Sequence, residues 1–333
     1  MPEPAPPWQG TARRSAPARR GLSCALPPPS ASRRAVLTLN IIGCGRAGKT
    51  LARLFGTTRV LALQDLLDRT PAGAEECAAF AGAGRAVAAL DEARPAELWL
   101  IATPDGVIAE AAEALARSGL LRPGDAVFHL SGAHPGALLA AAAERGAAVA
   151  SVHPVKSLAD PAAAATSFAG TWCGMEGDPQ ALAVLKPAFA ALGARLFDVD
   201  PRHKTIYHAA SVLVCNDLVA LMEAGLRAYA KGGLPRDQAL RVMEPLVRET
   251  VDNVFRLGTA DALTGPVARG DLATVARQLD ALAAWDGDVA DAYRALGRFA
   301  LALARSRGEA PADALAAIAA VLASPGIDAA KGD

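Results

Sequence analysis

Three glycines with the spacing G-x-G-x-x-G are the residues whose types and spacing point most directly to chemistry: Gly43, Gly45 and Gly48. In such a turn the first glycine permits a tight bend, the second lets the backbone approach a pyrophosphate, and the third packs the next helix on its strand. The helix N-terminus then holds the phosphates of a dinucleotide. The residues we expect to contact that dinucleotide here are Gly43, Gly45, Arg46, Ala47 and Gly48.

The adenine ribose is expected to lie at the end of the next predicted strand, beside Asp68, Arg69 and Thr70. Asp68 occupies the place of an acid that accepts a hydrogen bond from the 2′-hydroxyl of NAD. Arg69 and Thr70 instead offer a guanidinium and a hydroxyl to the 2′-phosphate of NADP. We favour NADP over NAD. An arginine that only begins a solvated helix is the structural alternative for Arg69.

Two further strand ends carry polar residues that should converge on a substrate, and a third should line the nicotinamide half. Thr103 and Pro104 follow an apolar strand and are expected at the nicotinamide, although helix capping would also explain these residue types. Ser131 could bond a carboxylate or carbonyl oxygen, and His153 could donate to one. Neither has the neighbours of a serine hydrolase triad, and a structural role for His153 is the alternative.

A polar stripe begins the C-terminal half of the chain, where Lys204, His208, Ser211 and Cys215 share one face of a predicted helix. Lys204 could act as a cationic donor or general acid at a substrate oxygen, and His208 could position the substrate or relay a proton. The alternative is a solvated helix face. The flanking residues are too apolar for a freely solvated helix, which favours a role in a site.

The segment 263–271 interrupts the predicted helices with two glycines, a proline and Arg269. Arg269 could clamp a carboxylate or a phosphate, including one in the cleft of a neighbouring subunit. Capping of adjacent helix ends by Arg269 and Asp271 explains the same residues equally well.

Alternating strand and helix patterns must position these residues. Strands are predicted at 36–42, 61–67, 97–102, 126–130 and 147–152, with helices at 72–80, 105–117 and 135–145. Two more strands, at 171–175 and 194–199, flank a helix at 179–192. After Asp200 the pattern is helical, to about 231 and then at 236–257, 272–284, 289–306 and 311–323. The predicted fold is α/β, a doubly wound Rossmann-type parallel sheet followed by an all-helical C-terminal domain.

Three regions follow from this pattern. Residues 1–35 are rich in Pro, Ala, Ser and Arg, which predicts a disordered tail, with a targeting segment as the less favoured alternative. Residues 36–200 are the expected NAD(P)-binding domain. Residues 201–325 are the expected helical domain for substrate binding and dimerisation.

Composition narrows the class of function. With 333 residues, 52% of them hydrophobic, the chain can bury two cores. Lys+Arg and Asp+Glu both total 34, and this balance disfavours nucleic acid or an anionic membrane as a partner and favours a small molecule. No run of 18 apolar residues occurs, so we expect a soluble, cytoplasmic protein without a membrane span. The five cysteines lack metal-ligand spacing, which predicts free thiols and no metal site.

Together these motifs resemble the Rossmann-like proteins that carry the helical domain of unknown function 2520, relatives of the 6-phosphogluconate dehydrogenase-like superfamily. The resemblance covers about residues 36–305 and rests on the segments 43–48, 102–105, 129–132, 153–154, 204–210 and 263–271. It implies an N-terminal NAD(P) domain, a helical domain that commonly dimerises, and an active cleft between them. Hydroxyacid dehydrogenases of the wider superfamily use a helical Lys followed four positions later by Asn, and the matching pair here is Lys204 and His208.

The expected function is that of an NADP-dependent oxidoreductase, acting as a homodimer. It would transfer a hydride between the nicotinamide and a small carbonyl, imine or hydroxy compound. The alternative is a dinucleotide-binding sensor or scaffold without turnover, which the same fold allows.

Overall fold

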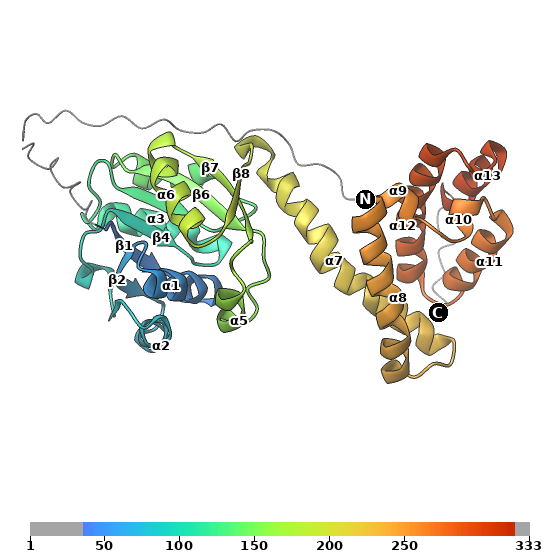
Figure 1. Ribbon diagram of the computed structural model, residues 1–333, viewed down its shortest axis with the longest axis horizontal. Helices are drawn as coiled ribbons and strands as arrows, with labels where there is room; N and C mark the ends of the chain where they lie inside the picture. Colours follow the sequence, from blue (N-terminus) through green and yellow to red (C-terminus); the bar gives the residue numbers. More distant parts are fainter. Residues whose placement is uncertain (1–35, 324–333) are drawn as a thin grey trace, which may run out of the picture.

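The computed structural model describes residues 36–323, which form a sheet domain and a helical domain joined by one long helix (Figure 1). The predicted tail, residues 1–35, and the end of the chain beyond 323 lie outside the described residues. Strands and helices alternate in the first domain, and the second is helical throughout, which confirms the predicted fold class.

One eight-stranded sheet forms the first domain, with the strand order β3-β2-β1-β4-β5-β6-β7-β8. The strands are β1 (Thr38–Ile42), β2 (Ala62–Leu67), β3 (Arg85–Val87), β4 (Leu98–Ile101), β5 (Ala126–His129), β6 (Ala148–Pro154), β7 (Trp172–Gly177) and β8 (Arg195–Asp198). Neighbouring strands are parallel except β6 and β7, which are antiparallel. The order reverses beside β1, which is where a doubly wound sheet binds its ligand.

The register of the sheet aligns one row of residues across four strands. Ile101 of β4 pairs with His129 of β5, His129 pairs with Ser151 of β6, and Ser151 pairs with Glu176 of β7. Polar side chains from three strands therefore meet near the carboxyl edge of the parallel part of the sheet.

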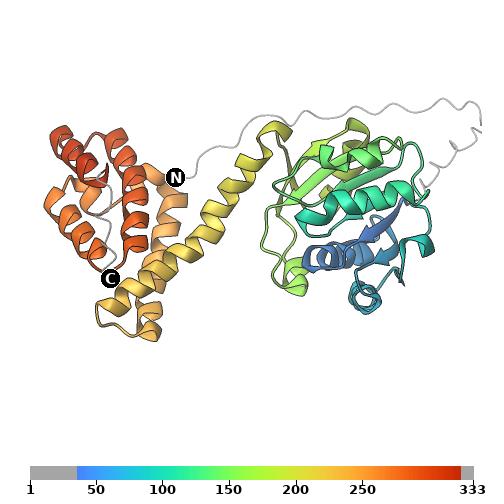
Figure 2. The same ribbon diagram turned by 180° about the vertical axis from the view of Figure 1, so that it is seen from behind.

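Helices cover both faces of the sheet (Figures 1 and 2). They are α1 (Arg46–Thr58), α2 (Pro71–Ala81), α3 (Ile108–Arg117), α4 (Ala140–Ala143), α5 (Pro161–Thr166) and α6 (Pro179–Ala191). On one face Phe55 of α1 and Phe128 of β5 pack edge-to-face on Phe189 of α6, with ring centroids 5.9 and 6.2 Å apart. On the other face Ile108 and Leu115 of α3 belong to a second buried cluster. The sheet therefore separates two apolar cores, as a doubly wound fold requires.

Two elements differ from the sequence prediction. The short edge strand β3 and the helix α5 lie where the sequence analysis named no element. Strand β3 has three residues, too few for a period to show. Helix α5 begins at Asp160, whose Oδ1 accepts hydrogen bonds from the backbone N–H groups of Ala162 and Ala163 at 2.8 and 3.2 Å. A single capped turn of alanines forms there without an amphipathic pattern.

Two predicted helices begin as 3₁₀ turns. These turns span Asp105–Val107 ahead of α3 and Gly136–Leu139 ahead of α4. Both lie at the carboxyl edge of the sheet, where they shape the loops that follow β4 and β5.

The helical domain follows a 3₁₀ turn at Pro201–His203. Its helices are α7 (Lys204–Lys231), α8 (Arg236–Leu257), α9 (Thr259–Ala262), α10 (Pro266–Arg269), α11 (Leu272–Ala283), α12 (Gly287–Arg307) and α13 (Ala312–Ala323). Val275, Leu301 and Ile318 are central members of its main core. Gly297 lets α12 and α13 approach closely, since a Cβ there would lie 2.8 Å from Leu322 Cδ2. A smaller core joins α7 to α8 through Leu226 and Met243.

Helix α7 is unusual because its apolar surface lies open. By length and composition, Pro201–Lys231 could cross a membrane, with a mean hydropathy of 1.5 and only 6% of its most apolar window buried. Leu213, Val214 and Val219 are 64, 74 and 67% exposed. The sequence analysis expected no membrane span, because no unbroken run of 18 apolar residues occurs in the chain. An exposed apolar helix of this length requires a covering surface.

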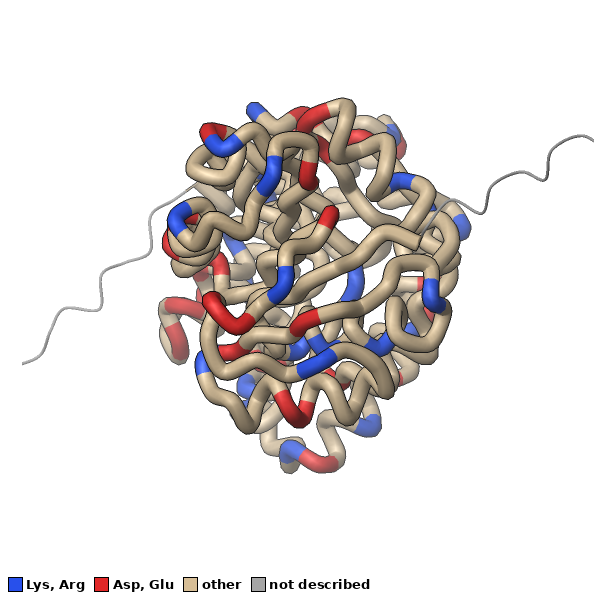
Figure 3. The backbone as a smooth tube through the Cα atoms, turned by 90° about the vertical axis from the view of Figure 1, so that its left-hand side faces the viewer, with Lys and Arg blue, Asp and Glu red and all other residues tan. Residues whose placement is uncertain are grey.

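Charges are mixed over the sheet domain. The view in Figure 3 shows blue and red positions interspersed on the face turned to the reader. This distribution accords with a net charge of zero for the whole chain.

Candidate functional site

The glycine turn between β1 and α1 has the geometry that its spacing predicted. Gly43 has a φ of 102°, and a Cβ there would lie 2.7 Å from the backbone of Ala102. A Cβ at Gly48 would lie 2.0 Å from the carbonyl oxygen of Gly43. Around Gly45, by contrast, no described atom lies within 4 Å of a built Cβ. The first and third glycines are therefore required by packing, whereas the second faces open space that a pyrophosphate could enter.

The N-terminus of α1 is also available to an anion. Its N-cap residue is Gly45, and no described side chain caps the helix there. The free backbone N–H groups of a first turn attract negative charge. This part of the site fits the phosphates of a dinucleotide.

A pocket of about 650 Å³ extends from the glycine turn along the ends of β2 and β4. The predicted cofactor residues that line it are Gly43, Gly45, Arg69, Thr103 and Pro104. Arg46 is exposed at the start of α1, and Gly48 is buried beneath the turn. The structure therefore brings most of the predicted cofactor residues to one cavity.

The residues at the end of β2 are the ones expected to distinguish the ribose of NAD from the 2′-phosphate of NADP. Asp68 lines the pocket, but its Oδ1 accepts a hydrogen bond of 2.9 Å from the backbone N–H of Cys44. Thr70 caps α2, its hydroxyl oxygen accepting from the N–H of Gly73 at 3.2 Å. Arg69 is exposed at the pocket and forms no ion pair with a described residue. Arg69 is thus the free cation at this position.

A second, smaller pocket of about 340 Å³ adjoins the first, and Ala102 and Thr103 line both. It brings together side chains that the sequence analysis selected from separate loops: Ala47, Thr103, Ser131, His153 and His208. Asp105 and Gly132 line it as well. The expectation that these strand ends converge is met by the geometry.

Ser131 is held within its own loop. Its hydroxyl donates to Asp105 Oδ2 at 2.9 Å and accepts from the backbone N–H groups of Ala133 and His134 at 3.2 and 3.1 Å. The hydroxyl therefore fixes the position of Asp105. The sequence analysis did not predict this contact, because nothing in a linear pattern shows that the loops after β4 and β5 meet.

His129 supports the same loop from beneath. The ring is fully buried, its Nδ1 accepts from the backbone N–H of Ser131 at 3.1 Å, and its Nε2 lies 3.1 Å from the carbonyl oxygen of Pro135. A ring that accepts at Nδ1 donates at Nε2, so these two bonds define one neutral tautomer. Burial lowers the pKa of His129 to about 4, which keeps the ring neutral near pH 7.

Two imidazoles meet beside the small pocket. The rings of His153 and His208 are 5.5 Å apart, and a Cβ at Gly132 would lie 2.8 Å from His153 Nε2 and 2.4 Å from His208 Nδ1. His153 Nδ1 lies 2.8 Å from the hydroxyl of Tyr207. Gly132 is therefore the residue that leaves room for both rings, and Tyr207 is a site residue that the sequence analysis missed.

Two buried polar atoms at the small pocket have no hydrogen-bond partner among the described residues: Thr103 Oγ1 and His208 Nδ1. Buried polar atoms are nearly always paired in proteins. Two such atoms on one cavity wall are therefore groups that a bound molecule can satisfy.

Lys204 lies beside this pocket rather than in its lining. Its side chain is 1% exposed, its Nζ lies 3.0 Å from Glu176 Oε1, and it donates to Ser151 Oγ. Glu176 Oε1 also accepts from the backbone N–H of Gly136 at 2.8 Å. Burial lowers the pKa of Lys204, and the nearby Glu176 carboxylate opposes that shift. The proposed action of Lys204 on a substrate oxygen stays a prediction, and its observed partners tie α7 to the sheet.

The remaining predicted residues lie elsewhere. Cys215 is exposed on α7, and Arg269 is exposed at the end of α10 in the helical domain. Asp271 caps α11 by accepting from the N–H of Thr274 at 3.1 Å, which is the structural role given as its alternative. Arg269 does not line the small pocket of its own chain.

Comparison with known proteins agrees with these observations. A Rossmann-like domain matches residues 25–154, and the domain of unknown function 2520 matches residues 171–299. A search of curated proteins finds no match.

Solved structures resemble the whole two-domain arrangement. Protein TM1727 from Thermotoga maritima is 25% identical, with a TM-score of 0.65, over 81% of this chain and 100% of that one. The putative NADP oxidoreductase BF3122 from Bacteroides fragilis is 23% identical, with a TM-score of 0.64, over 80% and 98%. An imine reductase from Pseudomonas sp. is 18% identical, with a TM-score of 0.58, over 86% and 99%. The last two show likeness of fold.

The two matched domains follow each other in the order that the sequence motifs predicted. The first match includes β1 to β6, and the second begins at β7 and ends within α12. The chain therefore carries a Rossmann-like domain followed by the domain of unknown function 2520.

Proposed function

We propose that this protein is an NADP-dependent oxidoreductase, which transfers a hydride between the nicotinamide and a small carbonyl, imine or hydroxy compound. The observation that carries the proposal is the junction of the two pockets at Ala102 and Thr103. A dinucleotide with its phosphates on α1 would extend along the larger pocket toward the smaller one. Similar folds in proteins named as an NADP oxidoreductase and an imine reductase support this assignment.

The protein groups would bind and orient the reactants, and the reduced nicotinamide would supply the hydride. The glycine turn and the first turn of α1 would hold the pyrophosphate. Thr103, whose hydroxyl oxygen lacks a described partner, would face the nicotinamide half. His153 and His208 would bind the substrate in the small pocket, and Lys204 would act as a positioning residue through Glu176 and Ser151.

NADP is the proposed form of the cofactor because of the partners at the end of β2. One oxygen of Asp68 is already engaged by Cys44, whereas Arg69 is free to meet a 2′-phosphate. A guanidinium binds phosphate through paired, charge-assisted hydrogen bonds.

Calorimetric titration with NADPH and NADH tests this proposal. The Arg69→Ala variant is expected to bind NADPH about tenfold to 100-fold more weakly, since a hydrogen bond to a charged group contributes about 1.5–3 kcal/mol, and to bind NADH unchanged. Arg117→Ala, which removes an exposed arginine from α3, is the matched control and should bind both nucleotides as the parent does.

Two results of these measurements would contradict the proposal in different ways. A folded protein that binds neither nucleotide would contradict the oxidoreductase. Tight NADPH binding without substrate-dependent oxidation across a broad carbonyl and imine panel would instead favour the dinucleotide-binding sensor.

We further propose that the protein works as a soluble homodimer in a reducing compartment such as the cytoplasm, with α7 covered by a second copy. Both ends of α7 are docked on protein: Lys204 is buried beside Glu176, and Leu226 packs with Met243 of α8. Asp217 lies near the middle of the helix, and a carboxylate there would cost about 2.5–3.5 kcal/mol at the centre of a bilayer. A second copy therefore suits this surface better than lipid.

The proposed compartment rests on the cysteines. The buried thiols Cys44, Cys77 and Cys173 are free, which suits a reducing compartment.

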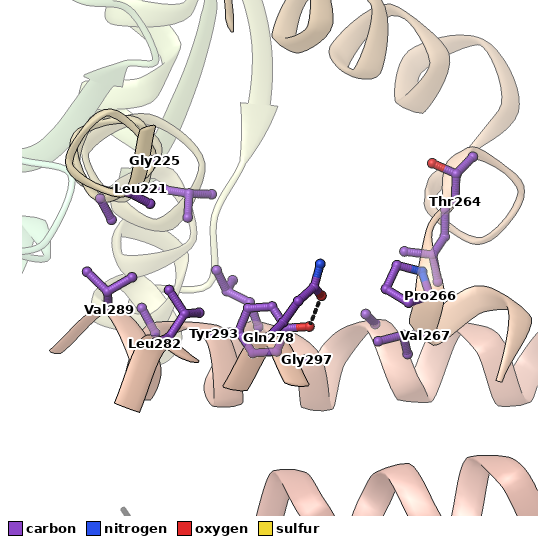
Figure 4. Close-up of a pocket in the computed structure, with 16 residues that line it drawn as sticks. Leu221, Gly225, Thr264, Pro266, Val267, Gln278, Leu282, Val289, Tyr293 and Gly297 are labelled. Atoms are coloured by element: carbon purple, nitrogen blue, oxygen red, sulfur yellow. Dashed lines mark hydrogen bonds between the residues drawn. The ribbon is translucent and has the colours of Figure 1, made fainter. Parts of the chain in front are cut away.

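An apolar cavity in the helical domain extends the surface that a second copy could cover. It measures about 410 Å³ and is lined by α7, α11, α12 and the segment that contains Pro266 (Figure 4). Among its polar lining residues, the hydroxyl of Tyr293 donates to Gln278 Oε1 at 2.8 Å, drawn as a dashed line in Figure 4. Leu221 and Gly225 of α7 border it, so it is continuous with the exposed helix.

Sedimentation equilibrium tests the dimer. Val214→Glu is expected to raise the dimer dissociation constant at least tenfold, because burying an unpaired carboxylate costs several kcal/mol. Arg117→Glu, on the surface of the sheet domain, is the control and should leave the dimer intact. A parent protein that sediments as a monomer, or a Val214→Glu variant that dimerises as the parent does, would contradict the proposal.

A further inference from the structure

Tyr207 and His153 form a pair that lies between the sheet and the small pocket. The Tyr207 hydroxyl lies 2.8 Å from His153 Nδ1, and the two rings meet edge to face at 5.6 Å. Strand β7 leaves space for the phenol at Gly174, where a Cβ would lie 2.9 Å from the hydroxyl oxygen. No other described residue shares a hydrogen bond with that hydroxyl. The phenol is therefore confined to a single partner.

The direction of this hydrogen bond follows from counting protons. Burial raises the pKa of Tyr207 to about 12 and lowers that of His153 to about 4, so a protonated phenol meets a neutral imidazole. If the phenol donates to Nδ1, the phenolic proton has its acceptor, and Nε2 carries the ring proton beside the small pocket that His153 lines. If Nδ1 donated instead, the phenolic proton would have no described acceptor. The first arrangement is the one that satisfies the pair.

The Nε2 edge of His153 then lies at the small pocket. A Cβ at Gly132 would lie 2.8 Å from His153 Nε2, and both residues line the small pocket. The unpartnered His208 Nδ1 lies at the same place. A donor, Nε2–H, and an acceptor or second donor, His208 Nδ1, are thus presented together to a bound molecule.

We propose that Tyr207 and His153 are a proton relay to a substrate oxygen, and that the substrate is accordingly an aldehyde or ketone rather than an imine. This inference rests on the proposed hydride-transfer function. The carbonyl carbon gains the hydride, and the π pair of the C=O bond moves to oxygen. That oxygen takes the proton from His153 Nε2, while the Tyr207 hydroxyl proton passes to Nδ1. A proton from water then reaches Nε2 as the Nδ1 proton returns to the phenolate, which restores both groups, and the nicotinamide is oxidised by two electrons.

Carbonyl compounds and imines differ in whether hydride transfer requires a proton donor. Hydride addition to a carbonyl creates an alkoxide, which is a much stronger base than a phenolate with a pKa near 12, so proton transfer from the phenol is favourable. A protonated imine is already cationic and yields a neutral amine without a donor at that step. A neutral imidazole N–H beside the reacting atom suits the carbonyl.

The test uses the full chain, NADPH, a panel of small aldehydes and ketones, and Δ1-pyrroline as the imine probe. Tyr207→Phe is expected to lower kcat for the carbonyl about 100-fold, within the usual range for a positioned proton donor, and to leave NADPH affinity unchanged. The solvent deuterium isotope effect on kcat should change with it. Tyr229→Phe, on the same helix but packed against α8, is the matched control and should behave as the parent.

A second readout needs no turnover. Nitrogen NMR of histidine-labelled protein should show His153 as the Nε2–H tautomer, and Tyr207→Phe should shift it toward a mixture. An Nδ1–H tautomer in the parent would overturn the relay. So would carbonyl reduction that Tyr207→Phe leaves unchanged, or reduction of Δ1-pyrroline alone.

The two proposals fail in different ways. If NADPH does not bind, the oxidoreductase itself is wrong. If NADPH binds through Arg69 and carbonyls are reduced at the same rate in Tyr207→Phe, the oxidoreductase stands and the relay falls.

Discussion

The Glu176→Ala variant is expected to unfold more easily than the parent by about 3–5 kcal/mol, because the substitution leaves the Lys204 ammonium buried without its counter-ion. Lys204 and Glu176 side chains are 1 and 6% exposed, so water cannot replace the lost carboxylate. The backbone N–H of Gly136 loses its acceptor as well. Urea unfolding of the sheet domain, followed by circular dichroism, should show a lower midpoint with an unchanged slope.

Two companion variants identify the cause. Glu113→Ala breaks an exposed ion pair with Arg117 on α3 and should change the stability by less than about 1 kcal/mol. A double variant, Glu176→Leu with Lys204→Met, removes both charges and should recover most of the loss. Loss of less than about 1 kcal/mol in Glu176→Ala would mean that solvent reaches this pair in the folded protein.

Acidification from pH 6.5 to about 4 is the second large perturbation, and it should destabilise the sheet domain. Burial lowers the pKa of His129 and of His153 from 6.5 to about 4. Between these values the unfolded chain binds protons at both residues and the folded chain does not, so falling pH favours unfolding. Each shift corresponds to about 3 kcal/mol, present above pH 6.5 and lost as the pH falls toward 4.

Comparison of unfolding free energies at pH 7 and pH 4.5 isolates the histidines. His129→Asn should be less stable at pH 7 but should lose markedly less stability on acidification than the parent. His203→Asn, which changes an exposed ring beside Asp200, is the control and should keep the slope of the parent over most of this range. An unchanged slope in His129→Asn would disprove a neutral buried ring at that position.

The sequence was sufficient to predict those parts of the fold that local patterns control. The buried strand Leu98–Ile101 is apolar at every position, and the helix predicted at 236–257 coincides with α8. The glycine turn could be predicted equally well, because the conformation and packing that require its three glycines involve only one strand, one turn and one helix. Elements as short as β3 and α5 carry too few residues for a period to appear.

The polar network of the site could not be predicted in the same way. Glu176 faces Ser151 only because β7 runs antiparallel to β6, a pairing that depends on the whole sheet. Tyr207 reaches His153 across 54 positions of sequence, through space left by Gly174. The periodic stripe on α7 correctly placed Lys204 and His208 on one face, but the same period extended to Cys215, which is exposed. The helical period identifies residues that share one face of a helix. It does not show how far along the helix the neighbouring domain covers that face.

The first turn of α7 is held on the sheet domain by the contacts of Lys204 with Glu176 and of Tyr207 with His153, so the rest of the helix projects as a lever arm. Its 28 residues span about 42 Å at 1.5 Å per residue, with the pivot at Lys204 inside the sheet domain. A tilt of about 10° at that pivot would move the far end of a helix of this length by about 7 Å. His208 lies one turn from the pivot and lines the small pocket, so a molecule that displaces its ring acts on the short arm. In a rigid helix of this length, a sub-ångström displacement at His208 would correspond to a displacement several times larger at the end that packs against α8.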